Sequence, residues 1–189
     1  MKEIFETERL TLKVLKEKDA KIILDYYIRN REFLKEVEPE RNEEFFKLLT
    51  QRLITKLEYK GMKNQSSFKL WIFLKDDKSY EKTIGSIALN NIIYGVFKSC
   101  HLGYKIDKDY KNKGYMTEAV NRIAEIAFND LKLHRIEANI MPRNKQSLKV
   151  VEKANFVNEG LAKKYLCING KWEDHLRMTL INEKSGTGE

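Results

Sequence analysis

Residues 110–118 (YKNKGYMTE) constrain the fold more than any other stretch, because they join an expected strand to an expected helix. The preceding residues 100–106 (CHLGYKI) have the pattern of a strand, and apolar residues recur at helical spacing over 116–131. The first N–H groups of a helix lack intrahelical acceptors and carry partial positive charge. Gly114, between lysines, lets the backbone approach a ligand closely. The junction is therefore a candidate phosphate site, with a solvated turn as the alternative.

A second strand and helix follow. Residues 135–140 (RIEANI) predict a strand, and residues 142–147 (PRNKQS) begin the next helix, which ends before residues 155–160 (NFVNEG). This order of strand, basic glycine turn, helix, strand, N-x-x-S turn and helix resembles the GNAT family of acetyl-CoA-dependent N-acetyltransferases. Within that family it is most similar to the RimJ/RimL group, which includes the YdaF-like proteins. Residues 7–12 (TERLTL) and 168–175 (INGKWEDH) also resemble that group, so the resemblance covers almost the whole chain.

The pattern of expected strands predicts a mixed α/β fold, since antiparallel strands come first and crossover helices come later. The expected strands comprise residues 9–15, 68–74, 84–93, 100–106, 135–140, 157–168 and 172–181. The resemblance implies a GNAT fold, with a central, mostly antiparallel sheet of six or seven strands, a splayed parallel pair and flanking helices. A chain of 189 residues fits one domain. We expect this domain to span residues 1–183, followed by a disordered tail at 184–189.

Three local signals add detail. Asp19 and Asn42 are expected to cap helices, because both residue types are preferred N-caps. The helix after Asn42 is expected to carry an apolar stripe that includes Leu49, Leu53 and Leu57. Asn169-Gly170 predicts a type I′ turn that closes the final hairpin.

The composition narrows the class of protein. The net charge is +8, with lysines spread among glutamates. A positive field would attract CoA phosphates or a substrate on RNA, but a solvated lysine-rich surface is the interpretation we favour. No segment resembles a nucleic-acid-binding module, no apolar run approaches the ~18 residues of a membrane span, and the N-terminus lacks a signal-peptide core. We therefore expect a cytoplasmic protein.

Cysteine and histidine spacing gives no metal or disulfide framework. Cys100 and Cys167 lack close partners, and each is expected to be a small buried hydrophobe. His101, His134 and His175 lie in three different expected elements. We accordingly propose no metal site.

The resemblance implies a site for acetyl-CoA at the basic turn. In GNAT proteins the pyrophosphate rests on the backbone amides of an R/Q-x-x-G-x-G/A loop. The matching positions, with the residue after them, are Lys111, Asn112, Lys113, Gly114, Tyr115, Met116 and Thr117. Gly114 matches the pattern strictly and Lys111 keeps a donor. Met116 replaces Gly or Ala, which is tolerable if its side chain points away from the ligand.

The resemblance also assigns roles on either side of the splay. Tyr104 and Ile106 are expected to bind the pantetheine through their backbone. Asn144 is expected to hydrogen-bond the pantetheine, and Ser147 to protonate the leaving thiolate. The alternative for Asn144 and Ser147 is a helix-capping pair, and both roles can hold together.

The general base is the least defined part of the site. Some RimL-type enzymes carry a glutamate just before the Asn-Gly turn, where this chain has Leu166. Glu137 is a candidate base, although the simpler interpretation is that its charge is paired and serves the structure of the strand. A peptide α-amine, whose pKa is ~7.7–8.0, needs less help than a lysine amine at ~10.4. The absence of a local carboxylate thus favours an α-amine acceptor.

Three functions remain open at this point. The leading hypothesis is an N-acetyltransferase that acts on a peptide or protein N-terminus, with ribosomal proteins as candidates, by direct attack in a ternary complex. The second is a small-molecule enzyme for a polyamine, an amino acid or an aminoglycoside, which an acidic acceptor cleft would favour. The third is a non-catalytic CoA-binding module. A homodimer is compatible with all three.

Overall fold

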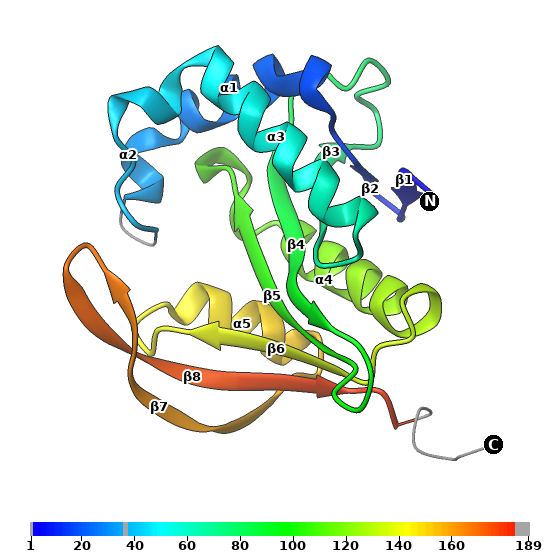
Figure 1. Cartoon of the computed structure of the whole chain (residues 1–189), viewed down its shortest axis with the longest axis vertical. Helices are drawn as coiled ribbons and strands as arrows, with labels where there is room; N and C mark the ends of the chain where they lie inside the picture. Colours follow the sequence, from blue (N-terminus) through cyan, green and yellow to red (C-terminus); the bar gives the residue numbers. More distant parts are fainter. Residues whose placement is uncertain (1, 36–37, 184–189) are drawn as a thin grey trace.

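The computed structural model describes residues 2–35 and 38–183, so the expected tail at 184–189 lies outside the described residues. One sheet of eight strands forms the centre, in the order β1-β2-β3-β4-β5-β6-β8-β7 (Figure 1). The strands are β1 (Ile4–Glu6), β2 (Leu10–Lys13), β3 (Phe68–Leu74), β4 (Gly85–Ile93), β5 (Ser99–Ile106), β6 (Arg135–Ile140), β7 (Val157–Ile168) and β8 (Lys171–Ile181). The β5–β6 pair is parallel and the other neighbours are antiparallel.

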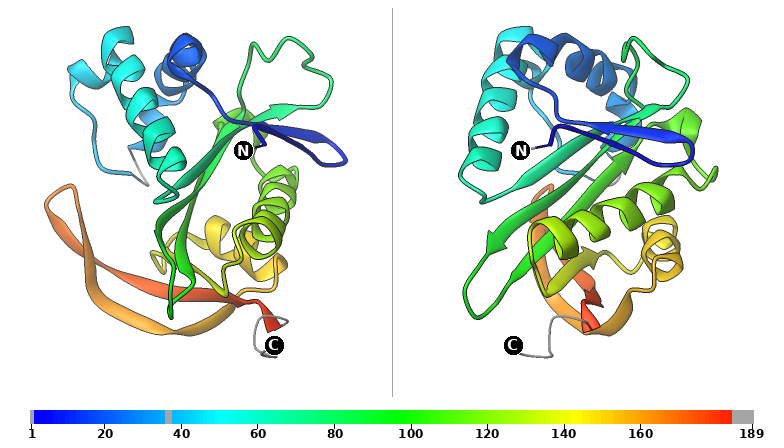
Figure 2. Two further views of the ribbon diagram at one scale, coloured as in Figure 1. Left: turned by 45° about the vertical axis from the view of Figure 1, so that its right-hand side comes forward. Right: turned by 90° about the vertical axis from the view of Figure 1, so that its right-hand side faces the viewer.

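Helices cover both faces of the sheet (Figure 2). The α-helices are α1 (Ala20–Arg29), α2 (Arg31–Leu34), α3 (Leu48–Lys63), α4 (Tyr115–Glu125) and α5 (Lys145–Lys153). Short 3-10 turns comprise Glu17–Asp19, Glu43–Phe46 and Lys108–Tyr110, and a π-helical turn, Ile126–Asp130, extends α4. No helix within residues 2–35 and 38–183 has the length and apolar character of a membrane span.

Strand β3 shows how two cores form on one sheet. Leu70 and Ile72 point into the larger core, which lies beneath α4 and α5, and both are fully buried. Trp71 and Phe73 point the other way, into a smaller core under α1, where Tyr26 packs edge-on against Trp71. The strand is therefore apolar along nearly its whole length, as expected for a strand with both faces covered.

The parallel pair separates early. Strands β5 and β6 pair only from Ser99 to His101 and from Arg135 to Glu137. Beyond these residues β5 stays with β4 as far as Ile106, and β6 stays with β8 as far as Ile140. The two strands diverge in Figure 1, so the edge of β5 that faces β6 has no strand partner in this stretch.

The expected mixed sheet with a splayed parallel pair is confirmed, with one strand more than expected. The additional strand is β1, which has only three residues. An alternating pattern cannot be recognised over so short a stretch, and Phe5 is its one buried side chain. The Asn169-Gly170 turn is also confirmed, because both residues have the left-handed backbone of a type I′ turn, with φ of 50° and 80°.

The expectation that Asn42 caps α3 was wrong. Asn42 caps the short turn Glu43–Phe46, and the chain is extended at Lys47 before α3 begins. The leucine stripe faces outward, with Leu49, Leu53 and Leu57 exposed at 69%, 55% and 67%. The buried face instead carries Gln51 and Thr55. Gln51 donates to Phe45 O at 2.6 Å and Thr55 donates to Gln51 O at 2.7 Å, whereas the buried Oε1 of Gln51 has no hydrogen-bond partner among the described residues.

Two smaller expectations also fail. The Asp19 side chain makes no cap bond to α1 but accepts from Lys16 N at 2.9 Å, closing the preceding turn. Cys100 is buried as expected, whereas Cys167 is exposed because it lies on the outer strand β7.

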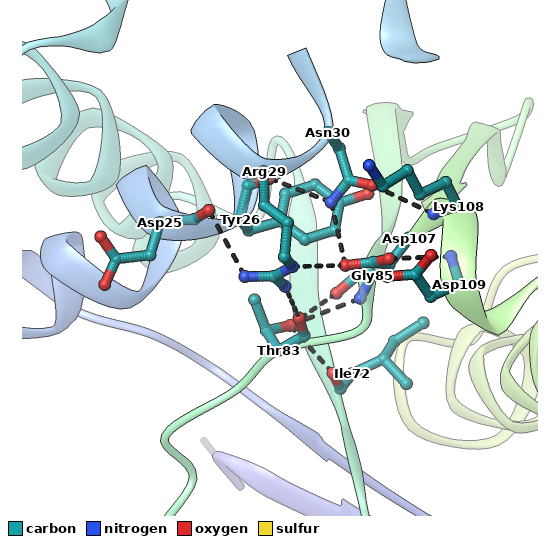
Figure 3. Close-up of polar contacts among 10 residues, drawn as sticks. All are labelled: Asp25, Tyr26, Arg29, Asn30, Ile72, Thr83, Gly85, Asp107, Lys108 and Asp109. Atoms are coloured by element: carbon teal, nitrogen blue, oxygen red, sulfur yellow. Dashed lines mark hydrogen bonds and ion pairs between the residues drawn. The ribbon is translucent and has the colours of Figure 1, made fainter. Parts of the chain in front are cut away.

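A buried carboxylate ties three elements together at the end of β5 (Figure 3). Asp107 is fully buried and accepts hydrogen bonds from Arg29 Nε at 2.7 Å and Asn30 Nδ2 at 3.0 Å. Arg29 also donates to Thr83 O at 2.8 Å, and Asn30 Oδ1 accepts from Lys108 N at 3.0 Å. The end of α1 is thereby fixed to the start of β4 and to the chain that leads to residue 114. Burial alone would raise the pKa of Asp107, but the bonds from Asn30, Asp109 and Arg29 outweigh it and lower the pKa.

We expect Asp107→Asn to lower the free energy of unfolding by about 1.5–3 kcal/mol at pH 7, because hydrogen bonds to a charged group are lost. The lowered pKa of Asp107 fixes the sign of the pH dependence. The stabilisation is complete above about pH 4, the ordinary range of aspartate, and disappears as the pH falls through the lower folded-state value. Urea unfolding across pH 3–7 measures it. Asp109→Asn, at an exposed neighbour, is the control. Equal losses in both variants would contradict this role.

Candidate active site

The turn from β5 to α4 presents a row of unused backbone donors. Asn112 and Gly114 have left-handed backbones, with φ of 60° and 81°, and Gly114 occupies the N-cap position of α4 without a side-chain cap. The first helical bond runs from Glu118 N to Gly114 O. Within the described part of the chain, no hydrogen bond is made by the N–H groups of Lys111 through Thr117. A helix N-terminus with free donors suits a pyrophosphate, so these residues fit the group that the resemblance implies.

The departure at Met116 does not obstruct this turn. The Met116 side chain is buried, and it belongs to the core together with Ala119 and Val120. It therefore points away from the row of free N–H groups. Lys111 and Lys113 place their ammonium groups 4.5 Å and 5.1 Å from the ring centres of Phe33 and Tyr110.

The turn is braced from the first residues of the chain. Arg9 donates to Lys113 O at 3.0 Å and pairs with Glu118 at 2.7 Å. Thr7 Oγ1 donates to Glu118 at 2.6 Å. Burial alone would raise the pKa of Glu118, but the hydrogen bonds from Thr7 and Arg9 outweigh it and lower the pKa. A Cβ at Gly114 would lie 3.3 Å from Arg9 Nη2. Sequence reasoning assigned these bracing residues no role, although the TERL segment was part of the resemblance.

Across the splay, α5 presents its own N-terminus. Asn144 is the N-cap, and its Oδ1 accepts from Ser147 N at 3.1 Å. The capping interpretation therefore applies to Asn144, while Ser147 contributes only its N–H. Tyr104 OH reaches from β5 to donate to Ser147 O at 2.8 Å, and burial raises the pKa of this tyrosine. Ile106 is half-buried beside the larger core.

Glu137 lies at the last paired position, where β5 and β6 separate. It pairs with Arg135 at 2.7 Å, Arg177 at 3.5 Å and His101 at 3.9 Å. Burial alone would raise the pKa of Glu137, but Arg135 and Arg177 outweigh it and lower the pKa. A carboxylate engaged in this way is a weak base. The geometry favours the structural interpretation of Glu137.

The hairpin β7–β8 supplies a carboxylate that sequence reasoning missed. Leu166 is 48% exposed and stands directly across from Glu173 in the strand register. Glu173 is only 9% exposed and pairs with Arg143 at 2.5 Å, next to the cap of α5. Since directly opposed residues share a face, this carboxylate occupies the same side of the hairpin as Leu166. The described residues contain no group of three or more His, Cys, Asp or Glu that could hold a metal ion.

Known proteins share this architecture. The family model described as an acetyltransferase (GNAT) domain matches residues 9–157. The ribosomal protein uS5-alanine N-acetyltransferase of Escherichia coli (strain K12) is 35% identical over 174 residues, which cover 92% of this chain and 88% of that protein.

Solved structures of acetyltransferases also resemble this chain. The ribosomal-protein-S5-alanine acetyltransferase from Vibrio fischeri has a TM-score of 0.89 and 37% identity, over 96% of this chain and 98% of that one. RimJ of Mycobacterium smegmatis, solved in complex with CoA-disulfide, has a TM-score of 0.85 over 95% of this chain and 85% of that one, and its 23% identity shows a shared fold. The matched residues include both helix N-termini and the splay between them. The chain belongs to the GNAT family of acetyltransferases.

Proposed function

We propose that this acetyltransferase transfers the acetyl group of acetyl-CoA to the α-amine of a peptide or protein N-terminus, with ribosomal proteins as the leading substrate class. The observation that carries the proposal is the near-complete match to the Vibrio fischeri acetyltransferase named for ribosomal protein S5 alanine. The match extends through the β7–β8 hairpin, because it covers 96% of this chain.

The charges on the sheet face opposite α4 and α5 support this choice of acceptor. Strand register places Glu137, Thr179 and Arg177 on this face. Each carboxylate here has a cationic partner: Glu137 pairs with Arg135, Glu159 also pairs with Arg135, and Glu173 pairs with Arg143. A polyamine, which carries several positive charges, would be better bound by unpaired carboxylates. A peptide, with one cationic terminus and a polar backbone, fits such a balanced surface.

The chemistry in this proposal is mainly positioning. Acetyl-CoA supplies an activated thioester. The N–H groups from Lys111 to Thr117 hold its pyrophosphate, and the free edge of β5 near Tyr104 and Ile106 aligns the pantetheine. Asn144 can offer the pantetheine its amide N–H groups while Oδ1 serves the cap. Ser147 donates a proton to the departing sulfur. Fixing the reacting groups in this way contributes much of the rate of a bimolecular transfer.

The acceptor preference is the direct test of the proposal. At pH 7.5 about a third of a peptide α-amine is neutral, compared with about 0.1% of a lysine amine. We expect kcat/KM for a peptide with a free N-terminal alanine to exceed that for the same peptide, N-terminally blocked and carrying a free lysine, by tenfold or more. Spermidine should be poorer still. Comparable rates on lysine or spermidine would contradict the proposal and favour the small-molecule alternative.

Ser147→Ala should lower kcat by about 10²-fold, the low end of the range for general acid catalysis, with CoA affinity and melting temperature unchanged. The cap is retained in this variant because Asn144 Oδ1 accepts from the backbone N–H of residue 147. Asn144→Ala is the matched comparison, and it should lose about 0.5–2 kcal/mol of stability. Steady-state kinetics and thermal melting measure both. Equal turnover in wild type and Ser147→Ala would remove Ser147 from the reaction.

A further inference from the structure

The proposed reaction is faster when a group takes a proton from the fraction of the acceptor amine that is still charged, and the inference below rests on that proposed function. Glu137 is held by Arg135 and Arg177, and Leu166 is apolar. The remaining titratable side chains on this face include an imidazole on β8. His175 is 4% exposed and lies in the same hairpin as Leu166.

An irregularity in β7 builds a polar cluster around this imidazole. The register between β7 and β8 shifts between Ala162 and Leu166. Lys164 has a left-handed backbone, with φ of 47°, and its N–H donates to Asp174 Oδ1 at 2.8 Å. Bulges of this kind redirect side chains and are frequent beside active sites. The neighbouring Tyr165 ring lies 5.4 Å from the ring of His175.

One hydrogen bond indicates which ring nitrogen of the imidazole carries a hydrogen. His175 Nδ1 lies 3.0 Å from the carbonyl oxygen of Glu173. A carbonyl oxygen can only accept, so Nδ1 carries the hydrogen in this contact, and in neutral histidine Nε2 then keeps a free lone pair. No hydrogen bond to Nε2 is present within the described residues. The backbone thereby orients the ring and leaves its basic nitrogen available.

The cluster borders the opening between β5 and β6. Asn139 lies two residues beyond the last paired position of β6, and its Nδ2 donates to Tyr165 OH at 3.2 Å. The Oδ1 atom of Asn139 is buried and has no hydrogen-bond partner. Asn139 stands across from Arg177, which shares a face with His175. A polar group without a partner beside the splay is suited to a ligand N–H.

The charges beside the imidazole on its own face of β8 are already paired. Along β8 the same-face neighbours are Glu173, which pairs with Arg143 and Lys171, and Arg177, which pairs with Glu137. From β7 the phenol ring of Tyr165 packs beside the imidazole. The acceptor ammonium would thus approach His175 without a free carboxylate to bind it as an ion pair.

We propose that His175 Nε2 accepts the proton of the acceptor ammonium, with Tyr165 and Asn139 lining the amine subsite. The neutral amine nitrogen then attacks the acetyl carbon, so that a C–N bond forms and the C–S bond breaks. The second proton of the nitrogen passes to the thiolate through Ser147, and His175 releases its proton to water. The sum is an ammonium and acetyl-CoA giving an N-acetyl amide, CoA and one proton.

The test uses His175→Gln and His175→Ala with an alanine peptide as acceptor. At pH 6.5, where about 3–6% of the peptide α-amine is neutral, we expect kcat/KM to fall by about tenfold or more in both variants, while the rise in melting temperature caused by CoA stays at the wild-type value. Imidazole added to His175→Ala should raise the activity of this variant at least fivefold, after the reaction without enzyme is subtracted, because the deletion leaves a ring-sized space. The same imidazole should not accelerate the wild type. His101→Gln, which removes the other histidine on this face, should keep its rate within about twofold.

The outcomes separate the two proposals. Full activity in the His175 variants, or an equal loss in His101→Gln, would overturn the assignment of His175 while acetyl transfer by the wild type stands. Loss without rescue by imidazole would also overturn it, since a purely structural role predicts that result. A wild type that acetylates neither peptide amines nor spermidine would overturn the proposed function, and the assignment of His175 with it.

Discussion

The early separation of β5 from β6 is the constraint on which the rest of the site depends. Only three residue pairs hold the parallel strands together, after which each strand follows a different neighbour. An unpaired strand edge inside a sheet is costly unless something else bonds to it. Helix α4 follows β5 in the chain and helix α5 follows β6, and the N-terminus of α4 carries unused N–H donors. The opening therefore brings together the unpaired edge of β5 and the free backbone donors before α4.

Long-range polar contacts anchor the connection from β5 to α4 at both of its ends. On one side Asp107 bonds Arg29 and Asn30, which are more than seventy positions earlier in the chain. On the other side Arg9 and Thr7 bond Glu118, which is more than a hundred positions later. The hydrogen bonds to the buried carboxylate of Asp107 contribute about 1.5–3 kcal/mol each, more than the few tenths typical of an exposed ion pair. Residues 108–117 lie between these anchors. Because both ends of this segment are held, its N–H groups can be presented without further side-chain contacts.

Sequence reasoning found what is encoded locally. The strand–turn–helix junction at Gly114, the Asn144 cap and the Asn169-Gly170 turn each depend on a few adjacent residues, and the structure has all three. It missed contacts that depend on register or on distant segments. The pairing of Arg9 with Glu118 and the position of Glu173 across from Leu166 are of this kind. The outward face of α3 shows a third limit, because periodicity identifies a stripe but not whether a partner element covers it.

The central claim is that the pyrophosphate of CoA lies on the backbone at Gly114. The most direct test compares the rise in melting temperature with CoA in wild type, Gly114→Asp and Gly95→Asp. Both glycines have left-handed backbones, with φ of 81° and 68°, but a Cβ at Gly95 meets nothing within 4 Å. CoA at 100 times its dissociation constant adds about 2.7 kcal/mol, or roughly 5–10 °C for a chain of this size. The account predicts this rise in wild type and Gly95→Asp and none in Gly114→Asp. An undiminished rise in Gly114→Asp would contradict it.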